Sequence, residues 1–144
     1  MPYANPVIPG FHPDPSVCRV GEDYYLVTSS FEYFPGVPIF HSRDVVNWRQ
    51  LGHVLSRPTQ LPLERAKSSG GIYAPTIRHG LGRLWMITTN TSVPVHILVH
   101  AERPEGPWSE PLLIEMGWID PSLTFDADGR VYICLLYTSP SPRD

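Results

Sequence analysis

The sequence predicts an all-β fold built from a repeated unit, and three observations lead to this prediction. A short motif occurs three times, as Asp14-Pro15-Ser16-Val17, Ala74-Pro75-Thr76-Ile77 and Asp120-Pro121-Ser122-Leu123. Each copy is followed by a polar turn and a second apolar segment. Trp48 lies 34 residues after Asp14, and Trp108 lies 34 residues after Ala74, so the unit is about 60 residues long. A β unit repeated around an axis in this way is typical of a β-propeller.

The individual elements follow from local patterns. Short apolar segments rich in β-branched and aromatic residues predict strands at 24–27, 84–87 and 95–99. Turn residues between paired strands occupy 21–23, 80–82 and 126–129. Seventeen prolines interrupt nearly every window of helical length. Residues 55–69, rich in Pro and charge, predict a long irregular connection between the first two repeats.

The length of the chain limits how much of a propeller it holds. Its 144 residues contain two repeats and the start of a third, whereas closed propellers have about four to eight blades. We therefore expect residues 1–133 to be the N-terminal part of a propeller. From Cys134 the sequence leaves the repeat pattern inside an expected strand, so residues 134–144 are interpreted as a non-native, adapter-derived tail. A natural Ser/Pro-rich tail is the alternative.

Composition and charge exclude several classes of partner. The formal net charge of −3 argues against nucleic acid, which calls for a basic patch. No stretch approaches 18 apolar residues and the N-terminus lacks the features of a signal peptide, so we expect no membrane partner and a cytoplasmic protein. Cys18, on an apolar segment, is expected to be a small core residue, and no disulfide framework is expected.

Asp14 and Asp120 are the candidate catalytic residues. Each precedes a proline, which is expected to hold the Asp backbone extended, at the start of the first strand of its repeat. Equivalent positions of a propeller converge on its axis, so the two carboxylates are expected to meet over a pocket and to suit acid–base chemistry on an uncharged substrate. Ala74 occupies the equivalent place in the second copy. The alternative is that Asp-Pro simply opens an extended segment.

Aromatic residues form a second candidate group. Rings can pack on the apolar faces of sugars, and Phe31 and Tyr73, which are expected outside regular strands, are the candidate ligand contacts. Trp48 and Trp108 recur with the repeat and are expected to be structural. Four further aromatic residues lie within strand patterns and are assigned to the core: Tyr24, Tyr25, Trp85 and Tyr132.

The six histidines do not show a metal-binding pattern. His96 and His100 lie in an alternating strand pattern, and neither HExxH nor CxxC occurs. No metal and no cofactor are expected. His12 stays open as a functional residue because it lies two positions before Asp14.

The segment from Asn5 to Ser16, Asn-Pro-Val-Ile-Pro-Gly-Phe-His-Pro-Asp-Pro-Ser, resembles the N-terminus of glycoside hydrolase family 43 in its β-xylosidase branch. The resemblance continues through residues 29–39, 42–48, 70–78 and 119–123, and spans residues 3–133 in order.

This resemblance implies a five-bladed β-propeller that releases xylose from the non-reducing end of β-1,4-xylo-oligosaccharides with inversion. It implies that Asp14 is the general base, that Asp120 tunes and orients the general acid, and that Phe31, Tyr73 and Ala74 line the subsite for the terminal sugar. Relatives commonly carry Trp at the position of Tyr73.

The family's general acid is a Glu on a later blade, and none of Glu102, Glu105, Glu110 or Glu115 matches its motif. The chain alone is therefore expected to have negligible activity. An α-L-arabinofuranosidase and a sugar-binding propeller without catalysis are the alternatives. The partner expected is a small xylo-oligosaccharide, and a homo-oligomer stays open for the full-length protein.

Overall fold

The computed structural model describes residues 3–136, which form three antiparallel sheets. The first sheet contains, in spatial order, β1 (Ser16–Val20), β2 (Asp23–Val27), β3 (Gly36–Ser42) and β4 (Arg49–Leu55). The second contains β5 (Ile72–Gly80), β6 (Arg83–Asn90), β7 (Val95–Ala101) and β8 (Leu112–Ile114). In the third, β9 (Ile119–Phe125) pairs with β10 (Val131–Leu136).

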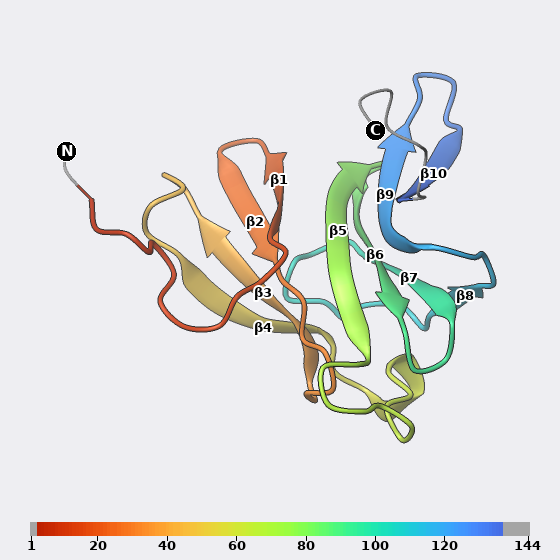
Figure 1. Cartoon of the computed structure of the whole chain (residues 1–144). Helices are drawn as coiled ribbons and strands as arrows, with labels where there is room; N and C mark the ends of the chain where they lie inside the picture. Colours follow the sequence, from red (N-terminus) through yellow and green to blue (C-terminus); the bar gives the residue numbers. More distant parts are fainter. Residues whose placement is uncertain (1–2, 137–144) are drawn as a thin grey trace, which may run out of the picture.

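These sheets are two complete blades and the start of a third, as the repeat predicted. Each sheet is a simple meander in which neighbouring strands follow one another along the chain. The first strands of the three sheets lie side by side, with β5 between β1 and β9 (Figure 1). We call β1, β5 and β9 the inner strands. The strands expected at 24–27, 84–87 and 95–99 and the three turns are confirmed.

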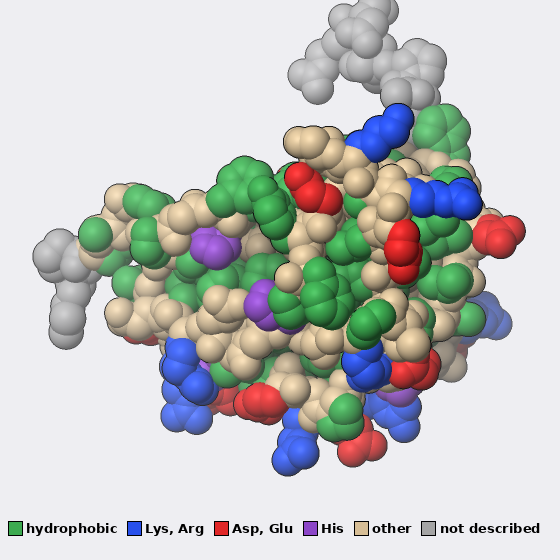
Figure 2. All heavy atoms as spheres, turned by 90° about the horizontal axis from the view of Figure 1, so that it is seen from below, with side chains coloured by type: hydrophobic (Ala, Val, Ile, Leu, Met, Phe, Trp, Pro, Cys, Tyr) green, Lys and Arg blue, Asp and Glu red, His purple; other side chains and the backbone are tan. Residues whose placement is uncertain are grey.

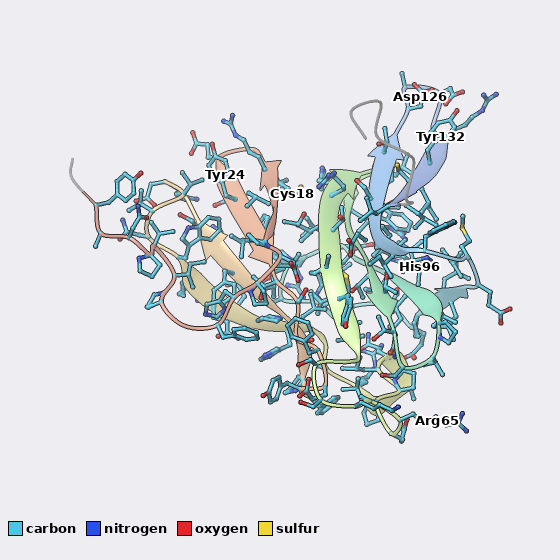
Figure 3. The ribbon with its side chains drawn as sticks, viewed as in Figure 1. Cys18, Tyr24, Arg65, His96, Asp126 and Tyr132 are labelled. Carbon is cyan, nitrogen blue, oxygen red and sulfur yellow. The ribbon has the colours of Figure 1, made fainter. Side chains whose placement is uncertain are left out.

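The core lies between the first two blades. Buried side chains recur at every second residue, for example Val37 and Ile39 on β3 and Ile97 and Val99 on β7, because alternate residues of a strand face the same side. Cys18 is buried in this cluster and points from β1 toward the second sheet (Figure 3), as expected for a core residue. Burial raises the pKa of its thiol.

The connection between the first two blades is irregular, as expected, except for one 3-10 turn at Pro58–Gln60. The buried Gln60 fastens it: its Oε1 accepts hydrogen bonds from the backbone N–H of Ser56 and Arg57, and its Nε2 donates to the carbonyl of Ser109 at 2.8 Å. Within residues 3–136, no helix is long and apolar enough to cross a membrane.

The recurring tryptophans occupy similar local structures. The indole Nε1 of Trp48 donates to the carbonyl of Val45, and that of Trp108 donates to the carbonyl of Pro104. Trp108 is buried in the core, whereas Trp48 is half-buried. Both close a loop after the third strand of their blade, which agrees with a structural role.

The assignment of Tyr132 to the core is wrong. Tyr132 is 48% exposed, because β10 is the outer strand of a sheet with only two strands and no further sheet covers it. Apolar residues of the neighbouring segment are exposed for the same reason, among them Leu112, Trp118 and Val131.

The boundary expected after Ile133 lies inside β10, whose register against β9 shifts shortly after it, between Cys134 and Leu136. Strand β10 continues to Leu136, and Cys134 pairs with Ser122 of β9. The remainder of the expected tail, residues 137–144, lies outside the described residues. The division at 133 stays a prediction.

Candidate active site

The candidate residues lie at one end of the inner strands. Asp14 comes two residues before β1, Asp120 is the second residue of β9, and Ala74 lies near the start of β5. All three inner strands run upward in Figure 1, so their first residues face the lower side of the molecule. Figure 2 looks onto this end, where apolar side chains lie over the middle and most basic side chains lie around the margin.

Both aspartates have a left-handed backbone, with φ of 53° at Asp14 and 54° at Asp120. The expectation of an extended backbone is therefore wrong. A following proline disfavours the right-handed helical region, and Asp tolerates the left-handed region better than most residues do. A left-handed non-glycine residue costs about 1–3 kcal/mol and is found at functional sites more often than elsewhere. The two aspartates thus share one unusual geometry, which Ala74 does not adopt.

The carboxylate of Asp14 is held by a serine that lies two residues after β2. The hydroxyl of Ser29 donates a 2.6 Å hydrogen bond to its Oδ2, and the Ser29 N–H donates to the carbonyl of Pro13 at 3.0 Å. Ser29 is buried, whereas Asp14 is exposed. One carboxylate oxygen is thus fixed by a short, charge-assisted bond, which orients the group while leaving it accessible.

Asp120 is the more buried of the two carboxylates. Its burial, and to a smaller extent the negative charge of Asp14, raises the pKa of the Asp120 carboxyl above its ordinary value of 3.8. Burial disfavours the charged form, and a nearby like charge adds to this effect. The charge of Asp14 therefore acts on the Asp120 carboxyl although 105 residues lie between them in the chain.

Three aromatic rings follow one another close to Asp14 in the chain: Phe11 precedes Asp14 by three residues, and Phe31 follows its partner Ser29 by two. The Phe31 ring centroid lies 5.8 Å from that of Phe11 and 5.6 Å from that of Tyr73, the latter in an edge-to-face arrangement. Phe11 is 71% exposed and Phe31 is partly exposed. This row presents apolar ring surface on the segments that adjoin Asp14 and Ser29, which suits a ligand with one apolar and one polar face, such as a sugar.

The position of Phe31 is fixed by the second blade. Its N–H donates to the carbonyl of Ile72 at 2.9 Å, and the Ile72 N–H donates back at 3.0 Å. The close approach needs Gly71, because a Cβ there would lie 2.3 Å from the Phe31 carbonyl oxygen. Phe31 lies outside the named strands, as expected, with φ of 48°.

The expectation that Tyr73 also lies outside a strand is wrong. Strand β5 begins at Ile72, because residues 72 and 73 pair with Asn90 and Thr89 before the register shifts around Ala74. The Tyr73 hydroxyl donates to the carbonyl of Ser69 at 2.9 Å, and its own carbonyl accepts from the hydroxyl of Thr88. Tyr73 and Ala74 thus sit at an irregular strand start next to Phe31.

Two functional candidates were missed in the sequence, Ser29 and Phe11. Ser29 could have been found from the short turn at Gly21-Glu22, which sets the pairing of Ser16 with Val27. Extending that register two residues places Ser29 opposite Asp14. Phe11 gave no comparable signal, since its place beside Phe31 depends on an irregular segment before β1.

His12 is not joined to Asp14 by any hydrogen bond within residues 3–136. Its ring packs edge-on against Phe40, with centroids 5.1 Å apart, and its Nδ1 is buried without a protein partner. In the described part of the chain, no group of three His, Cys, Asp or Glu side chains could hold a metal ion. The chemistry that the site offers is that of paired carboxylates beside aromatic rings.

Comparison of the chain with known proteins identifies a family. The family model described as "Glycosyl hydrolases family 43" matches residues 3–142. A "Xylosidase/arabinosidase" from Butyrivibrio fibrisolvens is 52% identical over 96% of the chain and 27% of its own length. A "Non-reducing end alpha-L-arabinofuranosidase" from Bacteroides ovatus is 48% identical over 90% of the chain and 25% of its length.

Solved structures give the same result. The crystal structure of a "xylan beta-1,4-xylosidase" from Bacillus halodurans superposes with a TM-score of 0.87 at 44% identity, covering 92% of this chain and 27% of that chain. The sequence thus spans about a quarter of the length of its relatives, and its two blades and partial third are part of a five-bladed β-propeller. The chain belongs to glycoside hydrolase family 43.

Proposed function

We propose that the complete protein releases xylose from the non-reducing end of β-1,4-xylo-oligosaccharides with inversion, and that this chain supplies the general base and part of the sugar site. The observation that carries the proposal is the pair Asp14 and Asp120, which share a left-handed backbone at the same end of two inner strands and interact electrostatically. The names of several relatives, among them a "Beta-xylosidase" from Bacillus subtilis at 44% identity, support the substrate class.

In this proposal Asp14 activates water. It is exposed, so water reaches it, and the bond from Ser29 to Oδ2 leaves Oδ1 free to accept a proton. An inverting enzyme needs its base and acid roughly 6.5–9.5 Å apart, with water between the base and the sugar. The acid is supplied by a part of the protein outside this chain.

Asp120 is proposed to tune and orient that acid. A carboxylate in a partly buried place raises the pKa of an acid beside it, because two like charges in one site disfavour each other. The raised pKa of Asp120 itself shows that its surroundings already disfavour charge. Phe31, Tyr73 and Ala74 are proposed to border the terminal sugar, with the aromatic rings packing on its C–H face.

The experiment uses residues 3–133 of this chain joined to the remainder of the Bacillus subtilis β-xylosidase, a protein that we call the completed propeller. We expect it to hydrolyse p-nitrophenyl β-xyloside and to release α-xylose first, as NMR of the fresh product would report. Asp14→Asn should lower kcat by about 10²–10⁴-fold, the usual contribution of a general base.

Asp126→Asn is the matched control, since Asp126 lies at the opposite end of the third sheet from this site (Figure 3). Activity of Asp14→Asn equal to that of the control would contradict the role of Asp14. We expect no xylosidase activity from the 144-residue chain alone, and detectable turnover by it would overturn the proposal that the acid lies elsewhere.

An α-L-arabinofuranosidase is the second candidate, and the names of the Butyrivibrio and Bacteroides relatives favour it. Comparing kcat/KM for the nitrophenyl xyloside and arabinofuranoside decides between the two. Binding of xylobiose by a full-length protein that turns over neither substrate would instead favour a sugar-binding propeller.

A further inference from the structure

Arg78 is a side chain that contacts all three blades. It lies on β5, between the other two inner strands. Its Nη1 donates to the carbonyl of Ile77 at 2.9 Å and reaches the Ser16 hydroxyl of β1 at 3.5 Å. Its Nη2 donates to the Ser122 hydroxyl of β9 at 3.4 Å. The guanidinium therefore bridges β1 and β9 across β5.

The two serines are the link to the aspartates. Ser16 follows Asp14 by two residues, and Ser122 follows Asp120 by two residues. The Ser16 hydroxyl also accepts a 3.2 Å hydrogen bond from the backbone N–H of Ile77. A displacement of either serine relative to Arg78 is transmitted to an aspartate over one Pro residue, whose φ is fixed by its ring.

Arg78 breaks the repeat. The equivalent residue is Cys18 in the first copy and Thr124 in the third. The propeller scaffold thus accepts a small side chain at this place. The copy that lacks the aspartate is the one that carries the arginine.

The charge of Arg78 has no carboxylate partner. Among residues 3–136, its side chain forms no ion pair, although it is only partly exposed. Placing a charge out of water is unfavourable unless its hydrogen bonds are satisfied. Arginine suits such a bridge because its planar fork donates in several fixed directions at once, which lysine does not.

We propose that Arg78 is a positioning residue that sets the separation of Asp14 and Asp120 by joining Ser16 to Ser122. The role in catalysis rests on the proposed function. Two like charges repel each other, and both aspartates lie in strained backbone conformations. A bridge between β1 and β9 opposes both the separation of the two charges and the relaxation of the two backbones. Catalytic groups must be held within about 0.5 Å of their working positions, so the distance between the Asp14 and Asp120 carboxylates must be held within similar limits.

The test replaces Arg78 in the completed propeller. Arg78→Met keeps the length and apolar stem but removes the donors. We expect kcat to fall at least about tenfold with KM within about twofold, since the bridge touches no substrate and a 1 Å misplacement costs about 10²-fold. Arg83→Met is the control, because Arg83 lies at the far end of the β5–β6 hairpin and also loses one charge.

Two further readouts distinguish positioning from general damage. After Arg78→Met, Ser122→Ala should cause no additional loss of kcat, whereas it should lower kcat when Arg78 is present. Arg78→Lys, which keeps the charge and secures folding, should restore less than half of the lost kcat.

A crystal structure of the Arg78→Met variant tests the proposal without any activity. We expect the distance between the Asp14 and Asp120 carboxyl carbons to change by more than about 0.5 Å relative to the parent. An unchanged distance overturns the positioning role, whatever the kinetics. Absence of xylosidase activity in the parent would contradict the proposed function alone, since the crystallographic distance would still report on Arg78.

Discussion

Replacing Gly71 with alanine tests whether the second blade holds Phe31 in place. Gly71 has φ of +88°, and a Cβ built on it lies 2.3 Å from the Phe31 carbonyl oxygen and 2.7 Å from its carbon. Those backbone atoms must retreat by roughly 0.7 Å before the nearest contact reaches even 3.0 Å, since packed interiors do not absorb such overlap.

The cost of Gly71→Ala has two parts. An L-residue in the left-handed region costs about 1–2 kcal/mol, and overpacking against a fixed neighbour adds about 1–3 kcal/mol. The expected total is about 2–5 kcal/mol of unfolding free energy. Gly82→Ala is the matched control: Gly82 lies in the turn between β5 and β6 with φ of +72°, and nothing lies within 4 Å of its Cβ, so only the backbone part applies.

Both variants are measured in the completed propeller by thermal unfolding and by kcat/KM on the xyloside. Gly71→Ala should unfold at the lower temperature and lose at least about tenfold in kcat/KM, because Phe31 moves. Gly82→Ala should stay within about twofold of the parent, as a substitution away from the site does. Equal losses in the two variants would refute the argument that the close approach at Gly71 positions the aromatic row.

Three other outcomes are expected. Ser29→Ala should lower kcat by about tenfold with little change in KM, since it frees a carboxylate that a charge-assisted bond orients; an unchanged kcat would contradict the orienting role. Asp120→Asn should raise stability at pH 7 but not at pH 3. The raised folded-state pKa of Asp120 makes the ionised form unfavourable in the folded protein, and this penalty disappears as the pH falls below the unfolded-state value of 3.8. The 144-residue chain should self-associate in sedimentation experiments, because its two-stranded third sheet leaves an open strand edge and exposed apolar side chains; a monomer that unfolds cooperatively would argue against this.

The blades could be predicted because their signals are local. Period-two alternation and turn residues act within a few positions, and they located strands such as Val95–Ala101 and hairpin turns such as the one after Val20. The exposure of Tyr132 could not be predicted in this way, because it depends on whether another sheet covers β10 and not on the strand itself.

For the candidate site, residue type and repeat position predicted which residues take part, but not their conformation or their contacts. Asp14 and Asp120 stood out because the second copy lacks the carboxylate. Their backbone was predicted wrongly, since the rule for residues before proline favours an extended conformation in general, whereas Asp tolerates the left-handed conformation better than most residues do. The contact of Arg78 with Ser16 and Ser122 needed the packing of three blades, which no local pattern specifies.

The three copies of the motif contribute different parts of the candidate site, and their backbone geometry differs accordingly. In the first and third copies, aspartate adopts a left-handed conformation that alanine would adopt only at a cost of about 1–2 kcal/mol. In the second copy, Ala74 lies inside β5, which begins early enough for Ile72 to bind the backbone of Phe31. Asp120 also lies inside a strand, β9, but the register of β9 against β10 shifts between Ile119 and Ser122, around this left-handed residue. The second blade thus provides a wall of the site through its pairing with Phe31, and the first and third blades provide the two left-handed carboxylates.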